Sequence, residues 1–88
     1  MNEKELEKIF KSLANKRRIA ILKFLKKSNR VSVGEIAQAI KLSFKATSKH
    51  LMILLNADIL EKEQEGLVVF YFISKNVRSI VARLLSII

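Results

Sequence analysis

Hydrophobic residues recur every three or four positions through most of residues 3–56, the spacing that gathers them on one side of an α-helix. The pattern predicts four helices, each preceded by a residue whose side-chain oxygen can accept from the free N–H groups of the first turn. The helices are expected after Asn2, after Asn15 to about Lys27, after Ser32 to Ile40, and after Ser43 to about Asn56. Glu5 and Glu35 complete capping boxes with the first and third of these caps.

Beyond residue 57 the pattern changes to that of β-strands. Leu60–Gln64 and Val68–Ile73 are predicted strands around a turn at Glu65 and Gly66, and Val31–Val33 is a short extended piece. Asp58 lies where the preceding helix would end in a left-handed residue. Asn76 is predicted to cap a last helix with Val77, Ile80, Val81, Leu84 and Leu85 on its apolar side. The predicted order is helix, helix, strand, helix, helix, hairpin, helix, in a mainly α chain.

The length of 88 residues suits one domain, which we expect to span residues 1–88. A domain of this size buries only about 60–65% of its unfolded surface, yet 50% of its residues are hydrophobic. We expect the surplus to contact a second copy of the chain. The predicted dimer interface lies on the first and last helices and consists of Leu6, Ile9, Phe10, Leu13, Val77, Ile80, Val81, Leu84 and Leu85.

Several kinds of site are excluded by composition. The chain has no cysteine and one histidine, so disulfides and thiolate metal sites are excluded and little remains for zinc. His50 has no acid at useful spacing, and two glycines cannot build a phosphate-binding loop, so we expect no enzymatic activity and no cofactor. The longest apolar run, Leu67–Ile73, is far short of the ~20 residues of a membrane span. No secretory segment follows the charged N-terminus, so we expect a cytoplasmic protein.

The net charge of +9 is concentrated in one part of the chain. Residues 8–57 contain twelve Lys and Arg residues and a single acid, Glu35. A basic block inside a folded domain indicates a polyanionic partner, of which nucleic acid is the first candidate. A lysine-rich solvated surface, as in heat-adapted proteins, is the alternative.

Three residues, Lys41–Ser43, separate the third and fourth predicted helices. Two short amphipathic helices joined in this way, followed by a hairpin, predict a winged helix-turn-helix whose second helix enters the major groove of DNA. Thr47, His50, Leu51 and Leu54 are expected to face the core. The residues predicted to contact DNA are Lys41, Ser43, Phe44, Lys45, Ser48, Lys49, Met52 and, on the wing, Lys62.

Three features have alternative interpretations. His50 is expected to be a buried histidine bonded within its helix rather than a metal ligand. Arg18, at the end of the basic run Lys16–Arg18, contacts phosphate or forms a local ion pair. The run Phe70–Phe72 belongs to the core or stacks on RNA bases, and one apolar face of its strand is either covered or a docking surface.

Short segments between Phe10 and Tyr71 carry a further signal. They are Lys11–Asn15, Arg18 with Ile21 and Leu22, Val31–Ala37, Leu42 and Ser43, Ser48–Leu51, Ala57–Leu60, and Glu65 and Gly66 with Val69 and Tyr71. Together they resemble the arsenical-resistance repressor (ArsR) family, most distinctively at Ser48–Leu51. The resemblance implies a dimeric winged helix, joined through its first and last helices, that binds a two-fold symmetric operator, usually as a repressor.

The chain departs from this family at its metal sites and its wing. Metal-sensing members carry a Cys-x-Cys pair where this sequence has Ser32 and Gly34, and others use Asp and His on the last helix, where residues 74–88 have neither. Neither metal site can form, so we expect no metal. The family's wing usually bears arginine, whereas Glu61, Glu63 and Glu65 lie on this one. Phosphate would repel them, so we predict little wing contact with DNA beyond Lys62.

Two functions follow from these observations. The first is a sequence-specific regulator that binds double-stranded DNA as a homodimer, with an effector that the sequence does not identify. The alternative is a winged-helix module for protein–protein contact with little DNA binding, which would use the apolar strand face and the acidic wing.

Overall fold

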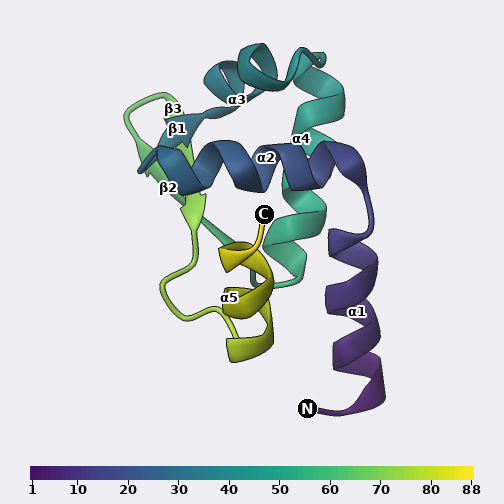
Figure 1. Ribbon diagram of the computed structural model, residues 1–88. Coiled ribbons are helices and arrows are strands. Elements are labelled where there is room, and N and C mark those ends of the chain that lie inside the picture. The colour runs from purple at the N-terminus through teal and green to yellow at the C-terminus, as the bar shows by residue number, and fades with distance from the viewer.

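The computed structural model describes residues 1–88. Its elements are α1 (Glu3–Leu13), α2 (Lys16–Lys27), β1 (Val31–Ser32), α3 (Val33–Ile40), α4 (Phe44–Asn56), β2 (Leu60–Glu65), β3 (Val68–Ile73) and α5 (Ser79–Ser86). In Figure 1, α2 crosses the middle of the molecule, with the hairpin of β2 and β3 near one end and α1 beyond the other. The predicted order of elements and the mainly α fold with a small hairpin are confirmed.

Side-chain caps fix where the first four helices begin. Asn2 accepts from the backbone N–H of Glu5 at 2.8 Å, and Asn15 accepts from Arg17 and Arg18 at 2.9 and 3.1 Å. Ser32 and Glu35 form the predicted capping box, and Ser43 accepts from the N–H of Ala46 at 3.1 Å. Each such cap stabilises its helix by about 1 kcal/mol. These starts are confirmed.

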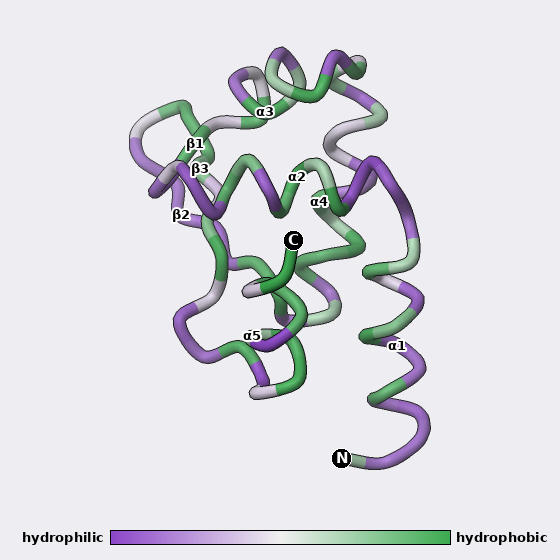
Figure 2. The backbone as a smooth tube through the Cα atoms, in the orientation of Figure 1, coloured by the Kyte–Doolittle hydropathy of each residue, from purple (hydrophilic) through white to green (hydrophobic).

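The core is one cluster of 13 buried hydrophobic residues drawn from every helix and strand except β3. The central helix α2 contributes Ile21, Leu22 and Leu25, and α4 contributes Leu51 and Leu54. Figure 2 shows hydrophobic and hydrophilic segments alternating along α1 and α2, as the two sides of each helix require. The core therefore fixes the rotation of α4, which decides which of its residues can face a partner.

The three strands form one antiparallel sheet in the order β1-β3-β2. Gly66 and Leu67 form the turn between β2 and β3, one residue beyond the predicted position, and Gly66 has φ +64°. Glycine adopts this left-handed conformation without the penalty that a Cβ atom imposes. Asp58 is also left-handed, with φ 59°, and ends α4 as predicted.

The last helix begins two residues later than the sequence predicts. Asn76 does not cap it, because its N–H donates to the Ser74 hydroxyl at 3.2 Å, and that hydroxyl donates to Glu61 at 2.7 Å. These bonds hold residues 74–76 in a turn, and α5 starts at Ser79 without a side-chain cap. Arg78 pairs instead with Glu5 of α1 at 2.8 Å. None of the helices combines the length and apolar character that a membrane-spanning segment needs.

The buried hydroxyl of Thr47 on α4 leads to a prediction about stability. Its side chain is fully buried and its hydroxyl has no hydrogen-bond partner, which costs about 1–3 kcal/mol. Thr47→Val keeps the shape and removes the hydroxyl, so the free energy of unfolding should rise by about 1 kcal/mol in urea denaturation. Thr47→Ser, the control, keeps the hydroxyl and should lose stability. A valine variant less stable than the parent would show that the hydroxyl is bonded in solution.

Candidate nucleic-acid interface

The helix-turn-helix consists of α3 and α4 joined by Lys41–Ser43. Lys41 adopts a left-handed conformation, with φ 56°, and ends α3. The N–H of Leu42 then donates to the carbonyl of Ala37 at 3.0 Å, and Ser43 caps α4. A chain reversal this tight packs the two helices together, so α4 stands at the surface while its inner side stays in the core.

The outer side of α4 carries the residues predicted to contact DNA. Phe44 is 63% exposed and Met52 55% exposed, and Lys45 and Lys49 are also exposed. Ser48 is half-buried between them, whereas Thr47, Leu51 and Leu54 are buried on the opposite side. The structure thus gathers the five predicted α4 residues on one surface, and Lys41 and Ser43 are exposed at its start.

Ile53 belongs to this surface and was missed by the sequence analysis. Its side chain is 41% exposed and lies beside Lys49 and Met52. The signal was available, because residues four apart on a helix are neighbours and Ile53 follows Lys49 by four.

A second set of residues lines a groove between α4 and the wing. The groove has a volume of about 470 Å³ and is lined by Ser32, Val33, Gly34, Phe44, Ser48, Leu67, Val68, Val69 and Tyr71. Leu67, at the tip of the hairpin, is fully exposed. The start of α4 and the wing tip therefore border one continuous surface.

The two faces of the hairpin differ in charge. Lys62 lies opposite Tyr71, and Glu61 and Glu63 lie opposite Phe72 and Phe70. Because side chains alternate along a strand, Lys62 shares the face of Tyr71, which packs against the core and lines the α4 groove. The three glutamates project from the other face. Repulsion of phosphate by the glutamates therefore acts mainly on the face away from α4, and little contact of the wing with DNA beyond Lys62 stays a prediction.

Arg30 pairs with two of the wing glutamates. Its Nε lies 3.2 Å from a carboxylate oxygen of Glu63, and its Nη2 lies 2.7 Å from one of Glu65. The guanidinium carbon sits 4.3 Å from the centre of the Phe70 ring, a cation–π contact. Exposed ion pairs contribute at most about 1 kcal/mol each, yet together they cancel charge on the wing. Arg30 also covers part of the strand face that the sequence left as either covered or open.

Arg18 ties three helices together. Its Nε donates to the Ser12 carbonyl at 2.6 Å and its Nη2 to the Lys11 carbonyl at 3.0 Å, so it caps the end of α1. Its Nη1 lies 3.1 Å from Nδ1 of His50 on α4. The guanidinium can only donate, so Nδ1 accepts and the proton of the neutral ring is on Nε2. The prediction of a local ion pair for Arg18 is wrong, as is that of a bond within the helix for His50, because this long-range contact replaces both.

The comparisons with known proteins agree with this geometry. The sequence matches the family described as bacterial regulatory protein, arsR family, over residues 15–62, which include both helices of the helix-turn-helix. The transcriptional activator HlyU of Vibrio cholerae is 37% identical over 81 residues, a match that covers 84% of this chain and 74% of HlyU. The chain belongs to the arsR family. The resemblance read from the sequence is confirmed.

Solved structures of relatives share the arsR-family fold. Reduced HlyU from Vibrio cholerae superposes with a TM-score of 0.82 at 31% identity, covering 98% of this chain and 86% of that one. The homodimeric winged helix-turn-helix DNA-binding domain of a possible ArsR-family regulator from Mycobacterium bovis has a TM-score of 0.82 at 30% identity, covering 96% and 74%. The winged helix-turn-helix is therefore the fold of this chain, and the chain is a transcription regulator.

The terminal helices present a smaller apolar face than the sequence indicates. Ile9, Val81 and Leu85 are buried in the core of the protomer itself, so they have little surface left for a partner. Phe10 is 48% exposed, and the other predicted interface residues are half-buried, namely Leu6, Leu13, Val77, Ile80 and Leu84. Ile87, which was not predicted, is 77% exposed. Six of the nine predicted interface residues therefore remain accessible, and Ile87 adds a seventh apolar residue to this face.

The family's metal positions are engaged differently here. Ser32, at one position of the Cys-x-Cys pair, has its hydroxyl in the capping box with Glu35. No three His, Cys, Asp or Glu side chains are grouped where they could hold a metal ion.

The Arg18–His50 contact predicts a pH dependence of stability. Burial lowers the pKa of His50 below its ordinary value, and the charges of Arg18 and Arg17 lower it further. Below about pH 6.5 the unfolded chain therefore takes up a proton that the folded chain resists. The contribution of His50 to stability is complete above this pH and is lost as the pH falls through the lowered folded-state pKa.

Thermal unfolding of the parent and of His50→Gln between pH 8 and 5.5 measures this effect. Glutamine keeps an oxygen acceptor for Arg18 but does not titrate. The midpoint of the parent should fall more steeply than that of the variant as the pH drops below about 6.5. Parallel curves would contradict a lowered pKa at His50.

Proposed function

We propose that this protein binds a two-fold symmetric operator in double-stranded DNA as a homodimer, with α4 in the major groove. One observation carries the proposal: the buried side of α4 leaves Phe44, Lys45, Lys49 and Met52 exposed on one surface. The major groove is about 12 Å wide and admits a single helix. A helix that stands at the surface with cations on its free side suits this groove.

The polar residues of this surface have distinct expected roles. Lys45, Ser48 and Lys49 are within reach of base edges or phosphates, since lysine donates to guanine and serine to several bases. Ser43 and Lys41, at the start of α4, are placed to contact the phosphate backbone beside the groove. Lys62, on the wing face that borders the α4 groove, is a further phosphate contact.

The apolar residues of the surface contribute by contact rather than by hydrogen bonds. Phe44 and Met52 are large and exposed, and apolar side chains at this position pack on thymine methyl groups. This combination predicts a preference for particular base pairs. A surface of lysines alone would bind all sequences alike.

Dimerisation would set the length of the operator. Phe10 and Ile87, with the half-buried Leu6, Leu13, Val77, Ile80 and Leu84, form the proposed interface. The Mycobacterium bovis relative is described as homodimeric, which supports this arrangement. Two copies of α4 related by a two-fold axis would meet half-sites about 34 Å apart.

We expect repression, in which the bound dimer blocks access to a promoter, and action in the cytoplasm, where bacterial DNA lies. The Vibrio relative is named an activator, so a transcription assay with a selected operator is needed to give the sign of regulation. The alternative function, a protein–protein module, predicts a folded dimer indifferent to DNA.

Alanine substitution at Lys45 or Lys49 tests the recognition surface. Loss of a base contact should weaken binding to a selected operator by about 1–3 kcal/mol and relax the preference at one position of each half-site. Loss of a phosphate contact should weaken binding to all sequences alike and reduce the salt slope by about one.

Fluorescence anisotropy at several salt concentrations measures both quantities. Lys4→Ala, which removes an exposed lysine of α1 far from α4 in sequence, is the control and should bind as the parent does. Parent-like affinity and sequence preference in both α4 variants would show that α4 is not the reading helix.

The double variant Ile80→Lys, Leu84→Lys tests the proposed dimer interface. Two buried charges in an apolar contact are unfavourable, so sedimentation should show dissociation at micromolar concentration while far-UV circular dichroism keeps its helical signal. Ala82→Lys adds a charge on the exposed side of α5 and should leave the dimer intact. A parent protein that sediments as a monomer at tens of micromolar would refute the interface.

A further inference from the structure

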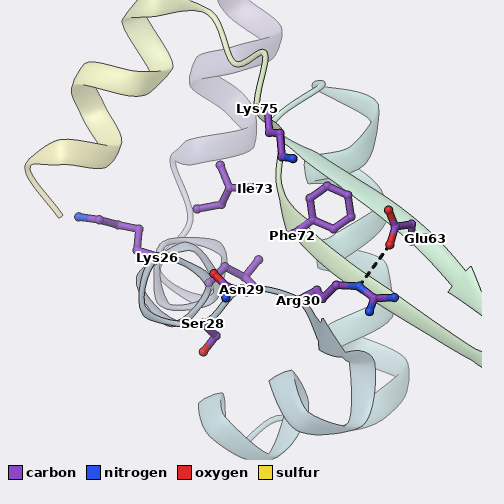
Figure 3. Close-up of a pocket in the computed structure, with 9 residues that line it drawn as sticks. Lys26, Ser28, Asn29, Arg30, Glu63, Phe72, Ile73 and Lys75 are labelled. Atoms are coloured by element: carbon purple, nitrogen blue, oxygen red, sulfur yellow. Dashed lines mark ion pairs between the residues drawn. The ribbon is translucent and has the colours of Figure 1, made fainter.

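A groove of about 600 Å³ lies between the C-terminal end of α2 and the sheet, and no residue of α3 or α4 lines it. Figure 3 shows Lys26, Ser28 and Asn29 on one side, Phe72 and Ile73 opposite them, and Lys75 and Arg30 beyond the two ends of the Phe72 ring. The volume falls within the range of about 300–1,000 Å³ that small-molecule sites occupy. Neither the helix-turn-helix nor the terminal apolar face uses these residues.

The lining of the groove combines apolar and cationic groups. Leu25, Phe72 and Ile73 supply the apolar part. Lys26 and Lys75 lie at its border, and neither forms an ion pair within the chain. Glu63 is the one acid of the lining, and Arg30 neutralises it at 3.2 Å. The lining therefore includes two lysines without an ion-pair partner, of which Lys75 lies beside the Phe72 ring.

The strand register separates this groove from the DNA surface. Phe72 and Phe70 share one face of β3, and Tyr71, which borders the α4 groove, lies on the other. Phe72 and Glu63 therefore meet an occupant of the groove from the side opposite to α4, whereas Ile73, at the end of β3, shares the face of Tyr71 and packs against the core. Binding of DNA and binding in this groove do not exclude each other.

We propose that the groove binds a small organic anion, a molecule with a flat apolar body and a carboxylate or phosphate group. The apolar body packs on Phe72 beside Leu25 and Ile73, and the anionic group lies at the amine of Lys75, toward which the exposed side chain of Lys26 can turn. Placement of a few polar groups around an apolar floor is the usual composition of a ligand site. This assignment goes beyond DNA binding and supplies the place for an effector.

Arg30 links the groove to the wing. Its guanidinium lines the groove, pairs with Glu63 there and holds Glu65 near the wing tip at 2.7 Å. The anionic group lies at the Lys75 end of the groove, and the apolar body on Phe72 reaches Arg30 at the other end, where it disturbs the pairing with Glu63 and so weakens the restraint on the hairpin. Occupancy should then lower affinity for DNA, a second step that rests on the proposed function.

Binding is tested without DNA by nuclear magnetic resonance of the ¹⁵N-labelled protein. The probes are 2-naphthoate and 2-naphthyl phosphate, which separate the two anionic groups, and the neutral control is 2-naphthamide. At up to about 10 mM, in the range of weak ligands, an anion should shift the amides of Lys26, Ser28, Asn29, Phe72 and Lys75. Absence of such shifts with both anions would overturn the site. Equal shifts with the neutral 2-naphthamide would show that charge plays no part in binding.

Variants assign the contacts. Each exposed ion pair contributes about two- to five-fold in affinity, so the double variant Lys26→Gln, Lys75→Gln should bind the probes about ten-fold more weakly. Lys27→Gln, next in sequence and outside the groove, is the matched control and should keep parent affinity. An equal loss of probe affinity in the double variant and in Lys27→Gln would show that only the net charge of the protein matters, and would refute the site.

Operator affinity with and without the bound probe tests the link to the wing. The parent should lose about two- to five-fold in affinity, the value of one exposed ion pair, and the double lysine variant should not respond. Resonance shifts at the groove residues without any change in operator affinity would overturn the link through Arg30 but would still support the anion site. Failure of the protein to bind any DNA would refute the proposed function, and the resonance experiment would still decide the groove.

Discussion

Burial of one side of α4 is the constraint on which the surface proposed to contact DNA depends. Thr47, Leu51 and Leu54 are at or near zero exposure, locked against the core that α2 and α3 complete. A helix has a fixed period of 3.6 residues, so burying one stripe dictates which residues point outward. The outward set consists of two lysines, a serine and three large apolar residues. A rotation of the helix by one residue would bury a lysine, which the core does not tolerate without a partner.

Arg18 adds a polar restraint to this packing. Arg18, on α2, donates to two backbone carbonyls at the end of α1 and contacts His50 on α4. One side chain therefore links α1, α2 and α4. The apolar terminal face proposed for dimerisation includes Phe10, which belongs to α1. In the proposed dimer this guanidinium would help to set the geometry between the two copies of α4, because it fixes α4 relative to α1, which carries Phe10.

Local signals in the sequence predicted most of the fold, and long-range contacts account for what they missed. Asn2, Asn15, Ser32 and Ser43 each bond backbone within three residues, so their positions alone give the helix starts. Arg18 and Arg30 have partners more than 30 residues away, and no periodicity indicates them. The late start of α5 has the same cause, because Ser74 bonds Glu61 across the sheet and holds Asn76 out of the helix.

The acidic residues of the wing show that the alternation of side chains along a strand matters more than their number in the sequence. Counted along the chain, Glu61, Glu63 and Glu65 make the hairpin acidic, and repulsion from DNA follows. Placed on a strand, all three share the face that carries Phe70 and Phe72, and Arg30 pairs with two of them there. The face toward α4 carries Lys62 instead. One hairpin thus separates a surface suited to DNA from a groove suited to an anion, with the backbone of β3 between them and Arg30 bonded to carboxylates of β2. A small molecule in that groove could change the position of the wing without entering the DNA interface.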